Sequence, residues 1–264
     1  MSIVEMNVTD GVAEVRLNRP ARKNALSMEM FDDLTAVGKA LKAEAGLRVV
    51  ILTGAGGDFC AGLDLEVMQS LAGRLDEMKA RLRNPAKGER ANWFQKPCFV
   101  WQELEVPVIA AIEGVCLGGG MQLALAADFR IARADARLAI MEAKWGMIPD
   151  MGISQSLPKL MRADVAKELM MTARMFSGEQ ALDYGLVTRL ADDPMAAARD
   201  LSAEISGRSP EAVTGVKQLV ERVWNMDPGE GLAVEAEIQA PIIGGANQIE
   251  AVMANIQRRP PKYR

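Results

Sequence analysis

The chain has 264 residues, of which 49% are hydrophobic and 25% charged, with a formal net charge of −4 at pH 7, as in an ordinary globular protein. The negative charge disfavours nucleic acid as the principal partner, because binding to a phosphate backbone requires a basic surface. The absence of histidine excludes Ser-His-Asp triads, Cys-His pairs and histidine-ligated zinc, so acid–base chemistry must come from carboxylates, Lys, Tyr, Cys or backbone donors.

The N-terminal stretch MSIVEMNVTDG lacks the basic and apolar regions of a signal peptide. No window of about eighteen residues is apolar enough to predict a membrane span. The three cysteines, Cys60, Cys98 and Cys116, are too far apart for a CxxC motif, and an odd number suits a reducing compartment. We therefore expect a cytoplasmic protein.

Strand-like and helix-like segments alternate along much of the chain. Apolar runs predict strands at residues 12–18, 48–56, 107–120, 128–133 and 137–141. A helix is predicted over residues 27–44, with Ser27 as its N-cap and Glu29 close to the capping-box position. This order indicates an α/β fold of repeated strand–helix units.

The segment 70–98 differs from its surroundings, because it is charged, contains Pro85 and carries the bulky Trp93 and Phe94. Two interpretations stay open here, a solvated helix with a loop or a mobile cover over a binding site. After about residue 195 the strand pattern ends. The remaining sequence predicts an α-helical segment that packs on the core or on another subunit.

Three consecutive glycines, Gly118 to Gly120, stand before a helical apolar run. Because glycine loses more backbone entropy on folding than any other residue, the triplet indicates that another group approaches this backbone closely. A helix beginning near Gly120 would present free N–H groups and the positive end of its dipole to an anion. Nucleotide-binding motifs do not fit, because Phe59 replaces the third glycine in GAGGDFCAG and no G-K-[ST] occurs.

The chain resembles the enoyl-CoA hydratase/isomerase family, the crotonases, in five ordered motifs. They are NRPARKNALS (18–27), LTGAGGDFCAGLDL (52–65), VPVIAAIEGVCLGGGMQLALAADFRIA (106–132), MEAKWGMIPDMGISQSLPKL (141–160) and the ending IQRRPPKYR. The resemblance implies a crotonase-type spiral of repeated ββα units over residues 1–195. A helical segment over residues 196–264 would support a homotrimer or a dimer of trimers. The implied partner is an acyl-CoA thioester substrate, with no metal and no cofactor beyond the CoA of the substrate.

The resemblance also implies an oxyanion hole for the enolate of the thioester. Its two donors would be the backbone N–H groups of Leu63 and Gly119. Side chains at Gly118 to Gly120 would then block the thioester, which explains the glycine triplet. Preorganised N–H donors of this kind stabilise the negative charge that develops in the transition state.

The CoA site is assigned by the same resemblance. Main-chain groups of residues 23–26, including Ala25, and of Ala61 are expected around the adenine and the pantetheine, with Arg22 or Lys23 near the phosphates. Basic residues at the C-terminus can add to this site, namely Arg258, Arg259 and Lys262. Taken alone, each of these basic residues is also typical of a solvated surface.

The catalytic carboxylates depart from one branch of the family. Hydratases with two glutamates place the first two residues after the glycine triplet, where this chain has Gln122. An amide cannot accept and return a proton at neutral pH, although it can hydrogen-bond a water or a substrate oxygen. The second glutamate is retained as Glu142, and Asp150 follows eight residues later.

Glu142 with a non-acidic first position resembles Δ3,Δ2-enoyl-CoA isomerases, in which one glutamate moves a proton between the α and γ carbons. Glu142 together with Asp150 resembles dienoyl-CoA isomerases, in which two carboxylates share the proton transfers. Asp150 also suits a plain turn after Pro149. We expect a double-bond isomerase. The alternatives are hydration by Glu142 alone and a CoA-thioester-binding protein without turnover.

Overall fold

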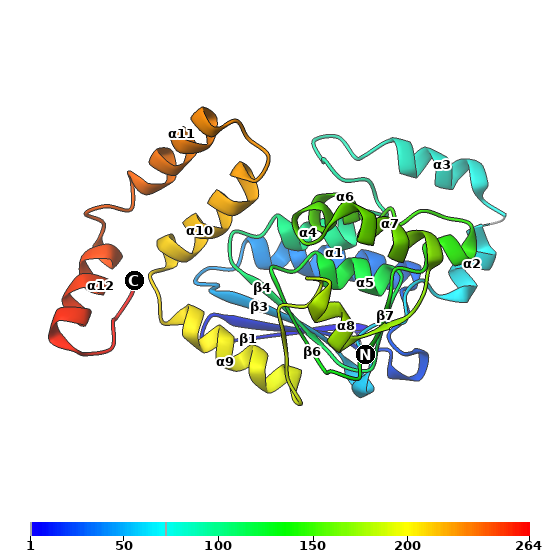
Figure 1. The fold of residues 1–264 in the computed structure, drawn as a ribbon, viewed down its shortest axis with the longest axis horizontal. Helices are drawn as coiled ribbons and strands as arrows, with labels where there is room; N and C mark the ends of the chain where they lie inside the picture. The colour runs from blue at the N-terminus through cyan, green and yellow to red at the C-terminus, as the bar shows by residue number, and fades with distance from the viewer. Residues whose placement is uncertain (1, 72) are drawn as a thin grey trace.

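The computed structural model describes residues 2–71 and 73–264. Strands and helices alternate up to Leu190, and in the described part of the chain only helices follow (Figure 1). The predicted α/β class is therefore confirmed. Within the described residues, no helix combines the length and the apolar character needed to cross a membrane.

Two β-sheets form the centre of the fold. The strands of the larger sheet are β1 (Val4–Thr9), β2 (Val12–Leu17), β3 (Val49–Gly54), β4 (Val108–Ile112), β6 (Phe129–Ala132) and β9 (Arg189–Leu190), in the order β1-β2-β3-β4-β6-β9. Those of the smaller sheet are β5 (Val115–Leu117), β7 (Arg137–Ala139) and β8 (Phe176–Ser177), in the order β5-β7-β8. In the larger sheet β1 and β2 pair antiparallel, and every other pair is parallel.

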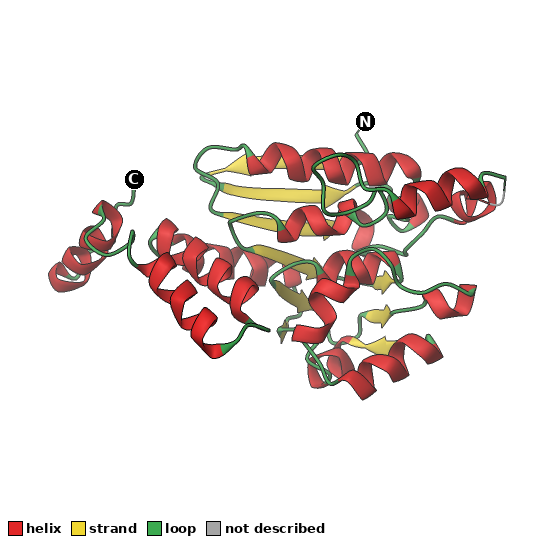
Figure 2. Cartoon of the chain, turned by 90° about the horizontal axis from the view of Figure 1, so that it is seen from above, coloured by secondary structure: helices red, strands yellow, loops and turns green. Residues whose placement is uncertain are grey.

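Helices cover both faces of the larger sheet (Figures 1 and 2). The α-helices up to the end of the core are α1 (Met28–Lys42), α2 (Leu65–Leu71), α3 (Leu75–Arg83), α4 (Lys96–Gln102), α5 (Gly119–Leu125), α6 (Ile153–Ser156), α7 (Ala163–Thr172), α8 (Gly178–Asp183) and α9 (Pro194–Ser206). Short 3-10 helices are η1 (Pro20–Arg22), η2 (Ala55–Gly57), η3 (Glu142–Trp145) and η4 (Leu157–Lys159). The last helices are α10 (Pro210–Val223), α11 (Pro228–Gln239) and α12 (Ala246–Gln257).

The chain passes repeatedly from the larger sheet to the smaller one. β4 joins the larger sheet, β5 joins the smaller sheet, and α5 follows; β6 and β7 repeat this order and lead into η3. Each repeat therefore adds one parallel strand to each sheet and moves the chain one step along the molecule. This is the predicted spiral of ββα units.

Burial on both faces explains why the strands read as continuous apolar runs. On β3, Val50 and Leu52 point into the main core, whereas Val49 and Ile51 pack on the opposite side with Ala198 of α9. In Figure 1, α1, α4 and α5 lie on one side of the sheet and α9 on the other. A polar residue at any of these four positions would therefore be buried whichever way it pointed.

Local signals place most elements, with two corrections. The Ser27 side chain caps α1 by accepting a hydrogen bond from the Met30 N–H at 3.2 Å, as predicted. Glu29 does not complete a capping box, because it is the second residue of the helix rather than the third. The run 107–120 forms two strands instead of one, because the chain turns at Gly114 with φ +53°.

The segment 70–98 is held at its C-terminal end. Trp93 stacks on Phe31 with ring centroids 4.8 Å apart, and its Nε1 donates to Asp32 at 2.8 Å. Beyond it, the buried Lys96 forms ion pairs with Glu89 and Glu103. Helix α3, earlier in the segment, is mostly exposed at one end of the molecule. Both predicted interpretations of this segment stay predictions.

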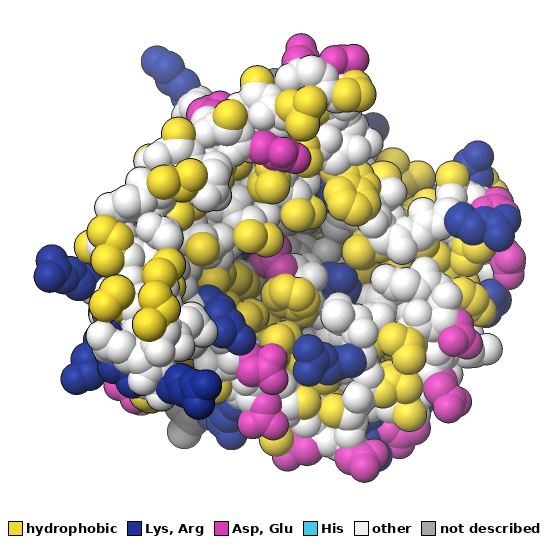
Figure 3. Space-filling view, turned by 60° about the vertical axis from the view of Figure 1, so that its left-hand side comes forward, with side chains coloured by type: hydrophobic (Ala, Val, Ile, Leu, Met, Phe, Trp, Pro, Cys, Tyr) yellow, Lys and Arg dark blue, Asp and Glu magenta, His cyan; other side chains and the backbone are white. Residues whose placement is uncertain are grey.

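The helices α10 to α12 form a C-terminal arm, residues 210–264, that extends from the core (Figures 1 and 2). Lys217 on α10 joins it to the core by donating to Asp128 at 2.8 Å and to the Val106 carbonyl at 2.9 Å. An apolar groove of about 750 Å³ lies between α10 and the core, and Figure 3 shows this hollow with apolar side chains at its rim. Because α9 crosses the predicted boundary at residue 195 and packs on the sheet, the arm begins after it. The division into residues 1–195 and 196–264 stays a prediction.

Candidate active site

Two loops that follow parallel strands lie side by side and form one wall of the site. The Leu26 N–H donates to the Gly62 carbonyl at 2.8 Å, and the Asp64 N–H donates to the Leu26 carbonyl at 3.0 Å. The Ala61 N–H donates to the Lys23 carbonyl at 2.9 Å. These bonds pair Leu26 with Leu63 in a single parallel bridge, which leaves the Leu63 N–H turned away from this neighbour.

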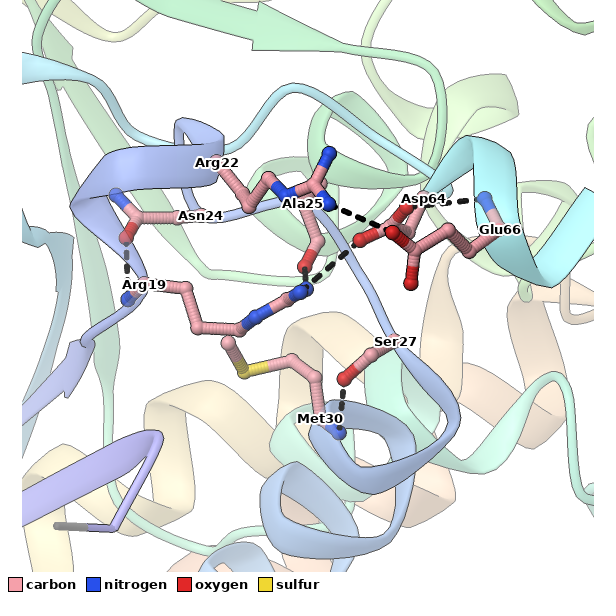
Figure 4. Close-up of polar contacts among 8 residues, drawn as sticks. All are labelled: Arg19, Arg22, Asn24, Ala25, Ser27, Met30, Asp64 and Glu66. Atoms are coloured by element: carbon pink, nitrogen blue, oxygen red, sulfur yellow. Dashed lines mark hydrogen bonds and ion pairs between the residues drawn. The ribbon is translucent and has the colours of Figure 1, made fainter.

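A partly buried ion pair between Arg19 and Asp64 joins the same two loops (Figure 4). Arg19 donates to the Ala25 carbonyl at 2.6 Å and to Asp64 Oδ2 at 3.0 Å, while Asp64 Oδ1 accepts from the Glu66 N–H at 3.1 Å. Burial would raise the pKa of Asp64, but the Glu66 N–H and the Arg19 guanidinium outweigh it, so this pKa is lowered. Asp64 therefore stays ionised and fixes the backbone next to Leu63.

Each glycine of the triplet has a local structural reason, either close packing or backbone conformation. A Cβ on Gly120 would lie 2.4 Å from the Cys60 carbonyl oxygen, and one on Gly119 would lie 2.8 Å from Leu26 Cδ1. Gly118 has φ +51° and ψ −120°, which only glycine adopts readily. These contacts are a second reason for glycine at 119 and 120, and the predicted reason, exclusion of side chains from the thioester, stays a prediction.

Leu63 and Gly119 present backbone N–H groups to a common cavity. Gly119 is the first residue of α5, so its N–H has no partner within the helix. Neither this N–H nor that of Leu63 has a hydrogen-bond acceptor among residues 2–71 and 73–264. Their segments are in direct contact, since a Cβ on Gly62 would lie 3.5 Å from the Gly119 nitrogen. The arrangement suits binding of one oxygen anion by two donors.

The cavity has a volume of about 300 Å³ and contains Glu142 as well as these two donors. Its lining residues are Arg22, Ala25, Ala61, Gly62, Leu63, Asp64, Leu65, Met68, Gly118, Gly119, Met141, Glu142, Trp145 and Met147. The wall formed by Leu65, Met68, Met147 and Trp145 is apolar and faces the polar groups. Such a mixture suits an apolar acyl chain that carries one polar reacting group.

Glu142 stands at the start of η3, directly after the end of the smaller sheet, and is only 8% exposed. Its Oε1 accepts a hydrogen bond from Gln122 Nε2 at 2.6 Å. Its Oε2 is buried and has no hydrogen-bond partner within the described chain. Burial raises the pKa of Glu142; the Gln122 bond opposes this rise and the nearby Asp150 charge adds to it. A carboxyl group of this kind is a candidate acid–base catalyst.

Other predicted residues lie outside the cavity wall. Among the described residues, Gln122, Asp150 and Lys23 do not line the cavity. Gln122 is buried, and its Oε1 accepts from the Met151 N–H at 2.8 Å. Asp150 is half-buried close to Glu142, and burial raises its pKa as well.

The predicted CoA residues are only partly brought together. Arg22, Ala25 and Ala61 line the cavity, and Arg22 is ion-paired with Glu66 at 2.6 Å. Lys23 pairs instead with Asp58 at 3.2 Å. The C-terminal basic residues do not join the site of the same chain, because α12 lies at the opposite end of the molecule from α2 (Figures 1 and 2). These are Arg258, Arg259 and Lys262.

Several site residues were not singled out by the sequence. Arg19 lies in the motif NRPARKNALS and Asp64 in LTGAGGDFCAGLDL. Their positions inside these motifs were the only sequence feature that could have marked them as site residues. The apolar wall of Met68, Met147 and Trp145 gave no signal, because Met and aromatic side chains are more often core residues. Only the folded chain shows that they border a cavity.

Comparisons with known proteins identify the family of the chain. The model of the family described as enoyl-CoA hydratase/isomerase matches residues 7–264. The peroxisomal Delta(3,5)-Delta(2,4)-dienoyl-CoA isomerase of Arabidopsis thaliana is 32% identical to this chain, and the alignment covers 100% of this chain and 96% of that protein. The mitochondrial methylglutaconyl-CoA hydratase of Mus musculus is 31% identical, and the alignment covers 96% of this chain and 80% of that protein. The solved structure of enoyl-CoA hydratase from Bacillus anthracis has a TM-score of 0.89 at 32% identity, covering 99% of this chain and 98% of that chain. The chain belongs to the enoyl-CoA hydratase/isomerase family and adopts the crotonase fold of its acyl-CoA enzymes.

Proposed function

We propose that this protein shifts a double bond within an enoyl-CoA, with Glu142 as the proton carrier. The observation that supports this most directly is the content of one cavity. Within the described residues, Oε2 of Glu142 and the N–H groups of Leu63 and Gly119 have no hydrogen-bond partner, and all three residues line this cavity. A base beside an oxyanion site can remove a proton from the carbon α to a thioester carbonyl.

The steps balance without an oxidant or a reductant. Oε2 of Glu142 forms a bond to the α-proton of a 3-enoyl thioester, and the electron pair of that C–H bond enters a dienolate. The negative charge moves to the thioester oxygen, where the Leu63 and Gly119 N–H groups stabilise it. The dienolate then takes the proton from Oε2 at its γ carbon, which gives the 2-enoyl thioester and returns Glu142 to its ionised form.

Hydration by two carboxylates receives less support from this geometry. In that reaction a water must be held between two proton-exchanging groups, whereas Gln122 contacts Glu142 directly at 2.6 Å. The other carboxylate on the cavity wall, Asp64, is ion-paired with Arg19. The relatives include both a dienoyl-CoA isomerase and a methylglutaconyl-CoA hydratase, so membership of the family does not decide between the reactions.

The predicted sharing of proton transfers by Asp150 stays a prediction. Its carboxyl group lies near enough to raise the pKa of Glu142, but Asp150 does not line the cavity among the described residues. We therefore assign both proton transfers on a 3-enoyl-CoA to Glu142. A 3,5-dienoyl-CoA, whose proton must travel farther, is the substrate on which Asp150 would be needed.

A panel of acyl-CoA thioesters tests the proposal. 3-Hexenoyl-CoA, 3,5-octadienoyl-CoA and crotonyl-CoA are incubated with the protein, and products are identified by mass spectrometry and ultraviolet absorbance. Isomerisation leaves the mass unchanged and brings the double bond into conjugation with the thioester, whereas hydration adds the mass of one water. Rapid hydration of crotonyl-CoA without isomerisation would refute the proposal, and binding without turnover would support the non-catalytic alternative.

We also propose that copies of the chain associate through the C-terminal arm, as the predicted homotrimer or dimer of trimers. Helix α12 exposes Ile249, Val252, Met253 and Ile256, whose spacing puts them on one helix face. An exposed apolar stripe of this kind favours contact with a second copy. Native mass spectrometry would give the number of copies, and a monomer at micromolar concentration would refute this. The cytoplasmic location stays a prediction.

A further inference from the structure

The orientation of the Gln122 side chain is dictated by its neighbours. A backbone N–H can only donate, so the atom that faces the Met151 N–H at 2.8 Å must be the amide oxygen. The amide NH2 group must then face Glu142 Oε1, at 2.6 Å. Because Gln122 is only 2% exposed, water is not available to satisfy a reversed amide.

This orientation makes the two oxygens of Glu142 unequal. Oε1 already receives an N–H, so a proton on Oε1 would face a second donor and is disfavoured. Oε2 is buried, has no hydrogen-bond partner in the described chain, and belongs to a residue on the cavity wall. The proton of neutral Glu142 therefore resides on Oε2.

We propose that Gln122 is a positioning residue that fixes the Glu142 carboxyl group so that Oε2 alone exchanges a proton with the acyl substrate. This inference rests on the proposed role of Glu142 as proton carrier. It assigns one N–H and the oxygen of the Gln122 amide to protein atoms, whereas the expectation that Gln122 binds a water or a substrate oxygen stays a prediction.

The same amide connects three parts of the site. Gln122 lies in the first turns of α5, the helix that starts with the oxyanion donor Gly119. Its bond to Met151 holds the loop that follows η3, and Met151 Sδ would lie 2.9 Å from a Cβ on Gly119. The base and one oxyanion donor are thus fixed relative to each other through a single side chain. Preorganisation of this kind removes the entropy of aligning base and donor during the reaction.

The electrostatic surroundings of Glu142 predict how the loss of Gln122 changes its titration. Asp150 adds negative charge, and burial raises the pKa of the Cys98 thiol well above 9.0, so that thiol is neutral. Across the cavity, Asp64 and Arg22 are each held in ion pairs. The Gln122 N–H bond stabilises the ionised form of Glu142 against burial and Asp150. Without it, Glu142 holds its proton to higher pH.

Two variants separate this role from packing. Gln122→Met keeps the size of the side chain and loses both hydrogen bonds, whereas Gln122→Glu keeps the acceptor for the Met151 N–H and can donate to Glu142 only while it is protonated. Gln155→Met makes the same chemical change at an exposed residue outside this network and is the matched control. Circular dichroism and calorimetry of CoA binding establish that each variant is folded.

The readout is exchange of the α-protons of butyryl-CoA with D2O, followed by NMR as a function of pH. This exchange needs the base and the oxyanion donors but neither isomerisation nor hydration. We expect Gln122→Met to lower the exchange rate about 10- to 100-fold, as for a misplaced catalytic group, and to move the acid limb of the profile to higher pH. KM and the control variant should change little. Gln122→Glu should exchange more slowly than wild type above the pKa of the new carboxyl group.

The proposed function and the proposed role of Gln122 are refuted by different results. Exchange by the wild-type protein without isomerisation of any enoyl-CoA would refute the proposed function and leave the role of Gln122 standing. An unchanged acid limb and rate in Gln122→Met would show that this residue only fills space. If Gln122→Met does not fold, Gln122→Glu decides, and a wild-type profile in that variant overturns the inference.

Discussion

Replacing Glu142 by Gln should have opposite effects on turnover and on stability. The change keeps the shape of the side chain, and the new carbonyl oxygen can still accept the hydrogen bond from Gln122. It removes the group that carries the proton, so we expect turnover to fall about 100-fold or more, the usual loss for one general acid–base group. Substrate binding should persist, because the N–H groups of Leu63 and Gly119 are unchanged.

The stability effect follows from the raised pKa of Glu142. An acid whose pKa is higher in the folded state than in the unfolded state binds its proton more tightly when folded, so the free energy of unfolding falls as pH rises. Below the ordinary value of 4.5, Glu142 is neutral in both states and the variant should match wild type. Above it the unfolded chain ionises first, and the advantage of the variant grows until pH exceeds the folded pKa.

Urea unfolding at several pH values measures this difference. Each tenfold difference between the acid dissociation constants of the two states is worth about 1.4 kcal/mol, which such experiments resolve. The variant should therefore be more stable than wild type at pH 8 and equal to it at pH 4. Glu44→Gln, at an exposed position, is the control. A difference that does not depend on pH, or a variant that is less stable at pH 8, would refute the account of the buried carboxyl group.

Two further changes test neighbouring parts of the site. Gly120→Ala introduces a Cβ at 2.4 Å from the Cys60 carbonyl oxygen, so the free energy of unfolding should fall by about 1–3 kcal/mol and turnover should fall with it. Gly231→Ala on α11, where a Cβ would lie 3.9 Å from its nearest neighbour, Val223 Cβ, should keep wild-type turnover; equal turnover in both variants would contradict the close packing of α5. Asp150→Asn removes a negative charge that raises the pKa of Glu142, so the acid limb of the rate on 3-hexenoyl-CoA should move to lower pH. The maximum rate should stay within about tenfold of wild type. A larger loss would show that Asp150 transfers a proton on this substrate.

The fold was predictable where burial gives a periodic or continuous pattern. β3 and β4 lie at the centre of the larger sheet and are apolar on both faces, so their sequences indicated them directly. β1 was missed although VEMNVT alternates apolar and polar residues; in the fold only Val4 of this edge strand is fully buried. β8 and β9 have two residues each, which is too short for any periodic signal. Their pairing depends on neighbours that sequence reasoning cannot locate.

In the site, residue types were easier to predict than orientations. Leu63, Gly119 and Glu142 were identified by their place in motifs, and they do share a cavity. The direction of Gln122 was not predictable, because it depends on the Met151 N–H, which a loop 29 residues further along the chain supplies. The packing reason for Gly120 likewise lies at Cys60, on another loop. In each case the deciding contact is non-local.

The fixed charges around the cavity are arranged so that one negative charge can move. Arg19 neutralises Asp64 and Glu66 neutralises Arg22, so these four side chains add little net field inside. The charge that remains begins on Glu142 and, after proton transfer, would lie on the thioester oxygen between two backbone donors. Burial and the Asp150 carboxylate both disfavour the ionised form of Glu142. Burial and the Asp150 carboxylate therefore weaken the fold at neutral pH, and they also favour transfer of the negative charge from Glu142 to the proposed oxyanion site.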